Sequence, residues 1–138
     1  MDRRSILLEM RKSGQLKGVK PCFVMVKHKM NNQAYSGEYI LSIKDQTIFF
    51  QKISKIFHLL HPSDDFSINV KDYVAYKFLH QVGKSSFTLF QKDGKTIKVD
   101  YMTGTREAFS TMDNMERIAK ELKALGLQDM EEIEDGKE

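Results

Sequence analysis

The side chains best suited to metal binding are four histidines, and they lie in separate segments: His28, His58, His61 and His80. His58 and His61 are three residues apart, a spacing that brings two imidazoles together on one face of a helix. No aspartate, glutamate or cysteine inside that stretch completes a ligand set, although Asp64 and Asp65 follow it. A structural zinc site takes four ligands. We therefore expect no metal site, and we interpret the histidines as polar surface residues.

Nucleophilic catalysis has equally little support. Ser5, Ser85 and Ser86 lie outside any Gly-x-Ser-x-Gly sequence, and the eight glycines form no phosphate-binding loop. The single cysteine, Cys22, adjoins an apolar run, which favours a small core residue over a reactive thiol. We therefore expect a protein that is not an enzyme and that uses no cofactor.

Binding of an anion is the chemistry that remains. The strand-rich part of the chain contains many lysines, of which Lys27 and Lys29 are the candidate ligand-binding residues. Lysines on outward strand positions also protect sheet edges from pairing, which is the alternative interpretation. The stretch from Cys22 to Met102 contains no arginine, and bidentate phosphate recognition depends on arginine. We therefore do not expect nucleic acid as a partner, and a lipid headgroup stays the second choice.

The C-terminal residues differ in charge from the rest. Residues 129–138 contain six acids and one lysine, a net charge of −5 against +3 for the whole chain, so the other 128 residues carry +8. The simplest interpretation of residues 128–138 is a flexible, solvated tail. Alternatively, Met130 and Ile133 could form a short amphipathic segment that docks on a partner.

Length and composition predict one domain. The chain has 138 residues, 41% hydrophobic and 30% charged, which suits a single globular core over residues 1–127. No apolar run approaches the ~20 residues of a membrane helix, and the N-terminal residues are too charged for a signal peptide. We expect a cytoplasmic protein.

The hydrophobic pattern changes twice along the chain. Residues 2–13 predict a short helix that ends at Gly14. Residues 22–102 contain short β-branched and aromatic runs separated by turn residues, which predicts about seven antiparallel strands. Asp93-Gly94 predicts a two-residue type I′ hairpin turn. Residues 54–65 fit neither a strand nor a helix clearly.

A second helix is predicted over residues 105–125. Its apolar positions follow helical spacing, with Thr105 as the N-cap and Gly126 just past the end: Ala108, Met112, Met115, Ala119 and Leu122. This stripe needs a partner surface, and the sheet is the one large surface available. The predicted fold class is mostly β with α: an antiparallel β-barrel or strongly bent sheet, capped by this helix, plus the short N-terminal helix.

The order of these segments resembles a known family. Residues 38–50 resemble the second and third strands of bacterial pleckstrin-homology-like (PH-like) and GRAM-like domains, residues 66–74 and 87–95 are similar to later strands and a late hairpin, and residues 105–125 match the capping helix. The resemblance implies a PH-like fold and a binding role. Lys27 and Lys29 match the start of the lysine pattern of phosphoinositide-binding members, whereas Glu38 stands where those members carry arginine.

These observations together predict a non-enzymatic binding or assembly module. Protein–protein contact or self-association is the leading expectation. The alternative is a peripheral module for an anionic ligand, such as a membrane lipid headgroup.

Overall fold

A computed structural model of the chain describes residues 3–30, 33–53, 64–103 and 108–131. Within these ranges, two helices and eight strands follow one another in this order: α1 (Arg3–Ser13), β1 (Val19–Met30), β2 (Gln33–Lys44), β3 (Thr47–Lys52), β4 (Phe66–Asn69), a 3₁₀ turn (Val70–Asp72), β5 (Tyr73–Gln81), β6 (Lys84–Gln91), β7 (Thr96–Met102), α2 (Ala108–Ala124) and β8 (Gln128–Asp129). Both predicted helices and the mostly β character are confirmed. Among the described residues, no helix is long and apolar enough to cross a membrane.

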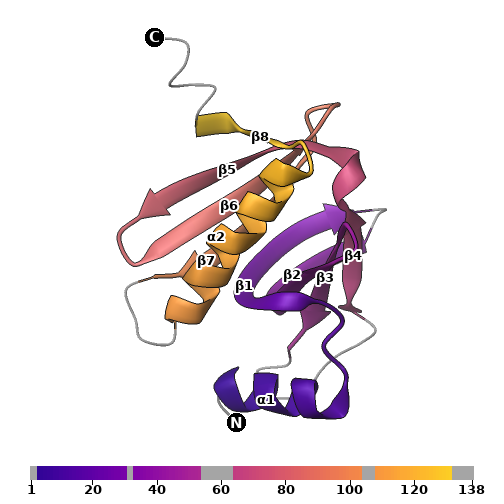
Figure 1. Cartoon of the computed structure of the whole chain (residues 1–138), viewed down its shortest axis with the longest axis vertical. Helices are drawn as coiled ribbons and strands as arrows, with labels where there is room; N and C mark the ends of the chain where they lie inside the picture. The colour runs from indigo at the N-terminus through magenta and orange to yellow at the C-terminus, as the bar shows by residue number, and fades with distance from the viewer. Residues whose placement is uncertain (1–2, 31–32, 54–63, 104–107, 132–138) are drawn as a thin grey trace.

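The strands form one open sheet in the order β4-β3-β2-β1-β7-β6-β5-β8. The closed barrel, one of the two predicted alternatives, is therefore wrong. Both edge strands are short, with four residues in β4 and two in β8, so neither offers a ladder long enough to close the sheet. Figure 1 shows two arms, β1–β4 and β5–β7, with α2 beside the junction where β1 pairs with β7.

The eighth strand lies in the segment that the sequence predicts to be a tail. Gln128 and Asp129 pair in parallel with Ala75 and Tyr76 at the start of β5. Hydrophobic periodicity cannot reveal a two-residue strand, because its pairing depends on where α2 delivers the chain. The remaining tail, residues 132–138, lies outside the described residues.

The main core lies between the sheet and α2. Alternate residues of β1 and β2, including Val24, Tyr39 and Leu41, belong to one buried cluster with Met115 and Leu122 of α2. Burial of such a helical stripe is the main source of helix stability in a globular domain.

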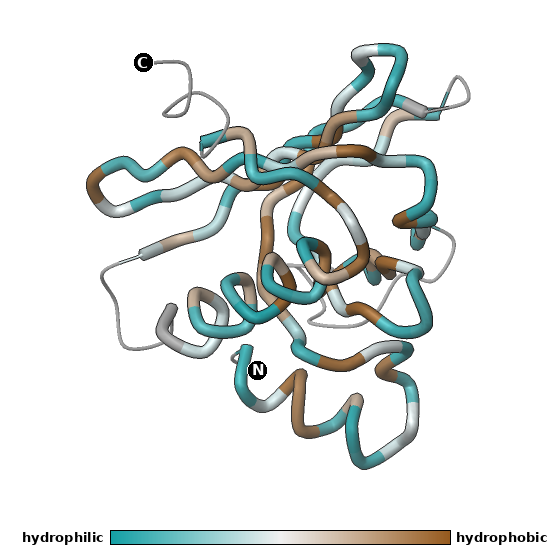
Figure 2. The backbone as a smooth tube through the Cα atoms, turned by 45° about the horizontal axis from the view of Figure 1, so that its top comes forward, coloured by the Kyte–Doolittle hydropathy of each residue, from teal (hydrophilic) through white to brown (hydrophobic). Residues whose placement is uncertain are grey.

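The opposite face of the same strands is covered by α1. Ile6 and Met10 of α1 pack on Ile40 of β2 and on Ile53, with Phe23 of β1 beside them. Strand β2 is therefore buried at six consecutive positions, 38–43, although it belongs to an antiparallel sheet. Figure 2 shows the alternation of hydrophobic and hydrophilic stretches along α1 that this docking requires.

Glycine ends both helices as predicted. At Gly126, with φ of 106°, the amide of Leu127 donates to the carbonyl of Leu122 and the amide of Gly126 to that of Lys123. These two bonds are the Schellman pattern, in which a residue with positive φ satisfies the last carbonyls of the helix. The predicted N-cap, Thr105, lies outside the described residues.

The type I′ turn predicted at Asp93-Gly94 is wrong, and the turn between β2 and β3 has the positive φ angles of that type instead. That turn requires positive φ at both central residues, and in the β6–β7 turn only Gly94 has it. The side chain of Asp93 accepts a bond from the amide of Lys95, which suits a longer turn. Asp45 and Gln46, between β2 and β3, both have positive φ. Local residue preference alone did not separate the two turns.

The burial of Met10 gives a first prediction. Met10 is 1% exposed against the sheet, whereas Leu8 on the same helix is 56% exposed. We expect Met10→Ala to lower the free energy of unfolding by about 2–5 kcal/mol, and Leu8→Ala to change it by less than about 0.5 kcal/mol. Urea unfolding followed by circular dichroism measures both. Equal effects of the two substitutions would show that α1 is not docked through Met10.

Candidate functional site: an arginine-lined groove between the helices

A groove lies between α1 and α2, above the first half of β1. Its volume is about 560 Å³, larger than the recess of about 410 Å³ beside the C-terminal end of α2. Nine residues line it, and we call it the α1–α2 groove: Arg3, Arg4, Leu7, Leu8, Arg11, Pro21, Phe23, Ser110 and Asn114.

The α1 wall follows from helical spacing. Arg3, Leu7 and Arg11 are separated by four residues each, and Arg4 and Leu8 form a neighbouring row, so all five share one side of the helix. The adjacent side, with Ile6 and Met10, is buried on the sheet. One face of α1 thus holds the helix in place while the next remains available to a ligand.

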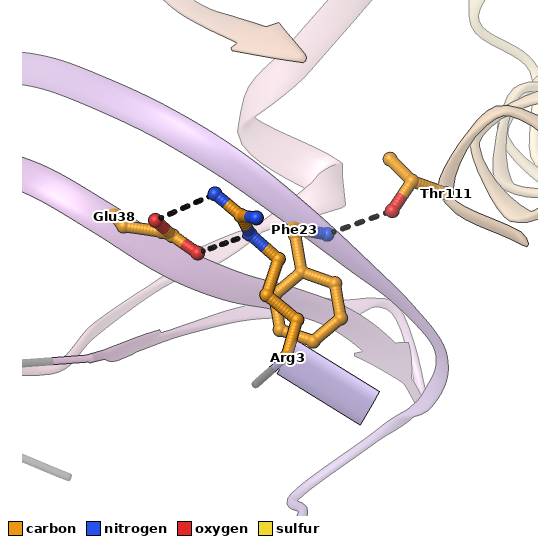
Figure 3. A network of polar contacts seen from close by, with 4 residues as sticks. All are labelled: Arg3, Phe23, Glu38 and Thr111. Atoms are coloured by element: carbon orange, nitrogen blue, oxygen red, sulfur yellow. Dashed lines mark hydrogen bonds and ion pairs between the residues drawn. The ribbon is translucent and has the colours of Figure 1, made fainter. Parts of the chain in front are cut away.

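The α2 wall is fixed to the start of β1 by two hydrogen bonds. The amide of Asn114 donates to the carbonyl of Pro21 over 2.8 Å, and the backbone amide of Phe23 donates to the hydroxyl of Thr111 over 3.1 Å. The β1–β2 register shifts between Val19 and Cys22, so the backbone there takes part of its bonding from α2. Figure 3 shows the Phe23–Thr111 bond beside the ion pair of Arg3.

Arg3 anchors the N-terminal end of α1 to the sheet. Its Nε and Nη2 donate to the two carboxylate oxygens of Glu38 over 2.8 and 3.3 Å, a bidentate arrangement visible in Figure 3. The Glu38 side chain is 7% exposed and that of Arg3 is 41% exposed. A carboxylate so deeply buried needs a charged donor to offset its lost hydration.

Arg4 and Arg11, unlike Arg3, form no described ion pair with an acidic side chain. Within residues 3–30, 33–53, 64–103 and 108–131, neither has an acidic partner, and both are exposed. Both line the groove together with Leu7, Leu8 and Phe23, an apolar floor in which Leu8 is 56% exposed. Guanidinium groups bind carboxylates in a bidentate manner. The groove is therefore suited to an anionic ligand that also has an apolar face.

The predicted site residues, Lys27 and Lys29, lie elsewhere. Both are exposed on β1, opposite Ser36 and Ala34 of β2. They share a face of the sheet with Phe23, but Lys29 is six residues further along, roughly 20 Å of strand. Lys98 of β7 is one residue beyond the Val26–Val99 pair, which brings it next to Lys27. The structure thus gathers a small lysine surface of Lys27, Lys29 and Lys98, separate from the groove.

The structure describes His28, His80 and Cys22 among the residues considered for metal binding or catalysis. His28 faces the core and stacks on Phe66, with its pKa lowered by burial. Cys22 is buried, and burial raises the pKa of its thiol well above the ordinary value. In the described ranges, no three histidine, cysteine or acidic side chains gather to hold a metal ion. His58 and His61 lie outside those ranges.

One serine–histidine contact was not foreseen from the sequence. Nδ1 of His80 is 3.2 Å from the hydroxyl of Ser85, in a recess of about 140 Å³ that Tyr101 and Glu116 also line. Burial raises the pKa of Tyr101 to about 12, and a hydrogen bond with Ser85 opposes that shift. The ring of His80 also stacks on Phe78. These contacts tie the ends of β5, β6 and β7 together.

The arginines of the groove were also not foreseen as a site. The strand-rich stretch from Cys22 to Met102, in which the sequence predicts the anion-binding residues, contains no arginine. The relevant arginines belong to α1, and the docking of α1 beside α2 adds Phe23 and the α2 wall to the leucines of the same helix. Arg3 and Arg11 each stand four residues from Leu7, and Arg4 stands four residues before Leu8, which was the signal that could have found them.

Comparison with known proteins gives little. No protein-family model matches the chain, and no curated protein matches it. Among solved structures, the hSac2 domain from human phosphoinositide phosphatase Sac2 is similar to it, with a TM-score of 0.49 and 9% sequence identity, over 94% of this chain and 89% of that one.

The Arg3–Glu38 pair gives a second prediction. Arg3→Met removes the donor and leaves a buried carboxylate unpaired, so we expect the free energy of unfolding at neutral pH to fall by about 1–3 kcal/mol. The double substitution Arg3→Met with Glu38→Gln recovers part of that loss, since the uncompensated charge is gone. Arg4→Met is the matched control, with an expected change below about 0.5 kcal/mol. A double-mutant cycle by urea unfolding measures the coupling, and a coupling near zero would contradict the assignment.

Proposed function

We propose that this chain is a non-enzymatic binding module of PH-like fold, which takes an acidic, amphipathic segment of a protein partner in the α1–α2 groove. Seven strands in sequence, followed by a helix that packs on the sheet, support the PH-like assignment. Folds of this kind host many roles, so the function must come from the site. The observation that carries the proposal is the pairing of Arg4 and Arg11 with an exposed apolar floor.

The apolar floor supplies most of the affinity. Burial of apolar surface contributes about 25 cal/mol per Å², whereas an exposed ion pair contributes only about 0–1 kcal/mol. Leu7, Leu8 and Phe23 therefore hold the ligand, and the arginines select for acidic residues and set its orientation. A helical segment with apolar side chains three or four residues apart fits such a groove between two helices.

A labelled peptide tests this proposal. The probe is a helical peptide of alternating Glu-Glu-Leu-Leu units, with a Lys-Lys-Leu-Leu peptide of equal length as the charge control. We expect the acidic peptide to bind and the basic peptide not to bind. The double substitution Arg4→Glu with Arg11→Glu should lower the affinity for the acidic peptide at least about tenfold, a loss of about 1.4 kcal/mol or more. Fluorescence anisotropy measures both.

The Lys27→Glu, Lys29→Glu double variant is the matched control, because it changes the net charge equally on another surface. Equal loss of peptide binding in the two double variants would indicate a non-specific charge effect and contradict the groove. Leu8→Ala should also weaken binding, because Leu8 is exposed in the free protein and lines the floor.

The lysine surface supports a second candidate function, a peripheral contact with anionic lipid. Lys27, Lys29 and Lys98 are exposed, and the described part of the chain gives them no ion-pair partner. Met25, on the same face of β1, is 43% exposed. A lysine near an anionic membrane contributes about 1 kcal/mol, and salt screens this attraction.

Vesicle co-sedimentation tests the second candidate. On vesicles of phosphatidylcholine with phosphatidylserine, we expect binding that falls steeply with salt and drops at least about tenfold in the Lys27→Glu, Lys29→Glu variant. The control is Lys92→Glu with Lys95→Glu, in the exposed β6–β7 turn. Unchanged binding in the first variant, or equal loss in both, would remove lipid as the ligand of this surface.

A further inference from the structure

The C-terminal part of this chain is strongly acidic. Residues 129–135 carry five acids and no basic residue, and we call them the acidic segment. The strand that leads into it, β8, pairs with the start of β5 beside the C-terminal end of α2. Figure 1 shows β8 and α1 at opposite ends of the molecule. The charge of the acidic segment is thus complementary to that of the groove, and β8, where the segment begins, lies far from the groove.

The first residues of the acidic segment already begin a helix. The chain is helical at Met130 and Glu131, and the side chain of Asp129 accepts a hydrogen bond of 3.0 Å from the amide of Glu131. An aspartate that accepts from an amide two residues on is a typical N-cap. Carboxylates in the first turn also suit the positive end of the helix dipole. A helix continued from this cap would place Met130 and Ile133 on one face, with glutamates beside them.

The acidic segment begins far from the groove of its own chain. Ser110 and Ala124 are fourteen residues apart on α2, roughly 21 Å along the helix axis. The segment starts near Ala124, and the groove extends along α2 from Ser110 to Asn114, which is ten residues from Ala124, roughly 15 Å along the axis. Asp135 is four residues beyond Glu131, a reach of at most roughly 14 Å even when fully extended. A second copy has no such restriction.

We propose that the α1–α2 groove of one copy binds the acidic segment of a second copy, so that the chain assembles head to tail. Met130 and Ile133 lie on the floor of Leu7, Leu8 and Phe23, while the carboxylates meet Arg4 and Arg11. This inference rests on the proposed function and names its partner. Because the two contacting surfaces differ, the contact leads to open chains or to closed rings, of which the smallest is a dimer in which each copy places its segment in the other's groove.

Two full-length variants, each defective in one surface, test the assembly. The groove variant is Arg4→Glu with Arg11→Glu, and the segment variant is Glu131→Lys with Glu132→Lys and Glu134→Lys. The altered arginines are exposed, so the groove variant should keep its fold. Circular dichroism and the urea midpoint check both proteins before use.

Light scattering coupled to size exclusion supplies the readout. We expect the unaltered chain to increase in mass with concentration and to decrease with salt, and each variant alone to be a monomer. An equimolar mixture should give a heterodimer and nothing larger, because it contains one intact groove and one intact segment per pair. A monomeric unaltered chain, continued self-association of either variant, or no heterodimer in the mixture would overturn the proposal.

The peptide experiment distinguishes failure of the head-to-tail assembly from failure of the proposed peptide-binding function. If the Glu-Glu-Leu-Leu peptide binds the groove while the unaltered chain stays monomeric, only self-recognition is wrong and the partner is another protein. If neither occurs, the groove is not an acidic-segment site. If the groove variant still self-associates in a concentration-dependent manner, another surface, such as a sheet edge, forms the contact. That result would also overturn the proposal.

Discussion

The two-sided burial of β2 is the constraint on which the rest of this structure depends. One face of β1 and β2 packs on α2, and the other packs on Ile6 and Met10 of α1. A one-residue shift of a strand moves every side chain to the opposite face of the sheet, so the residues of β2 that now pack in the main core would meet α1, and those that now meet α1 would enter the main core. The register of β1 is thereby fixed, and with it the place where the two helices approach each other. The groove exists because both helices flank the same strand.

Polar contacts then fix the orientation of the helices on the sheet, which apolar burial alone does not determine. Burial of Ile6 and Met10 fixes which face of α1 meets the sheet, but a hydrophobic contact is not directional. The bidentate Arg3–Glu38 pair and the hydrogen bonds of Thr111 and Asn114 to the start of β1 are directional. Arg3 is occupied by Glu38, whereas Arg4 and Arg11 on the same helix have no described acidic partner. Three arginines within nine residues therefore have two different roles, one structural and one available for binding.

The sequence predicted elements well where the physical signal is local. The helical stripe of α2, the Schellman glycine at Gly126 and the strand runs all depend on neighbours within a few residues. The predictions failed where competing arrangements have similar local preferences. Asp93-Gly94 fits several turn types, and the ladder of its hairpin selected one with positive φ at Gly94 alone. Whether a sheet closes depends on its edge strands, and β4 and β8 are too short to close it.

In the candidate site, too, some features follow from the sequence and others only from the tertiary structure. Composition alone established the basic body and the acidic segment, and the spacing of arginines around Leu7 and Leu8 is a property of the sequence. Lys27 and Lys29 could be placed on a strand, but the proximity of Lys98 required the pairing of β1 with β7. Only the tertiary structure decided that α1 docks beside α2, because that choice depends on the shape and burial of surfaces distant in the chain. Charge and helical spacing are thus properties of the sequence, whereas the groove that combines them exists only after packing.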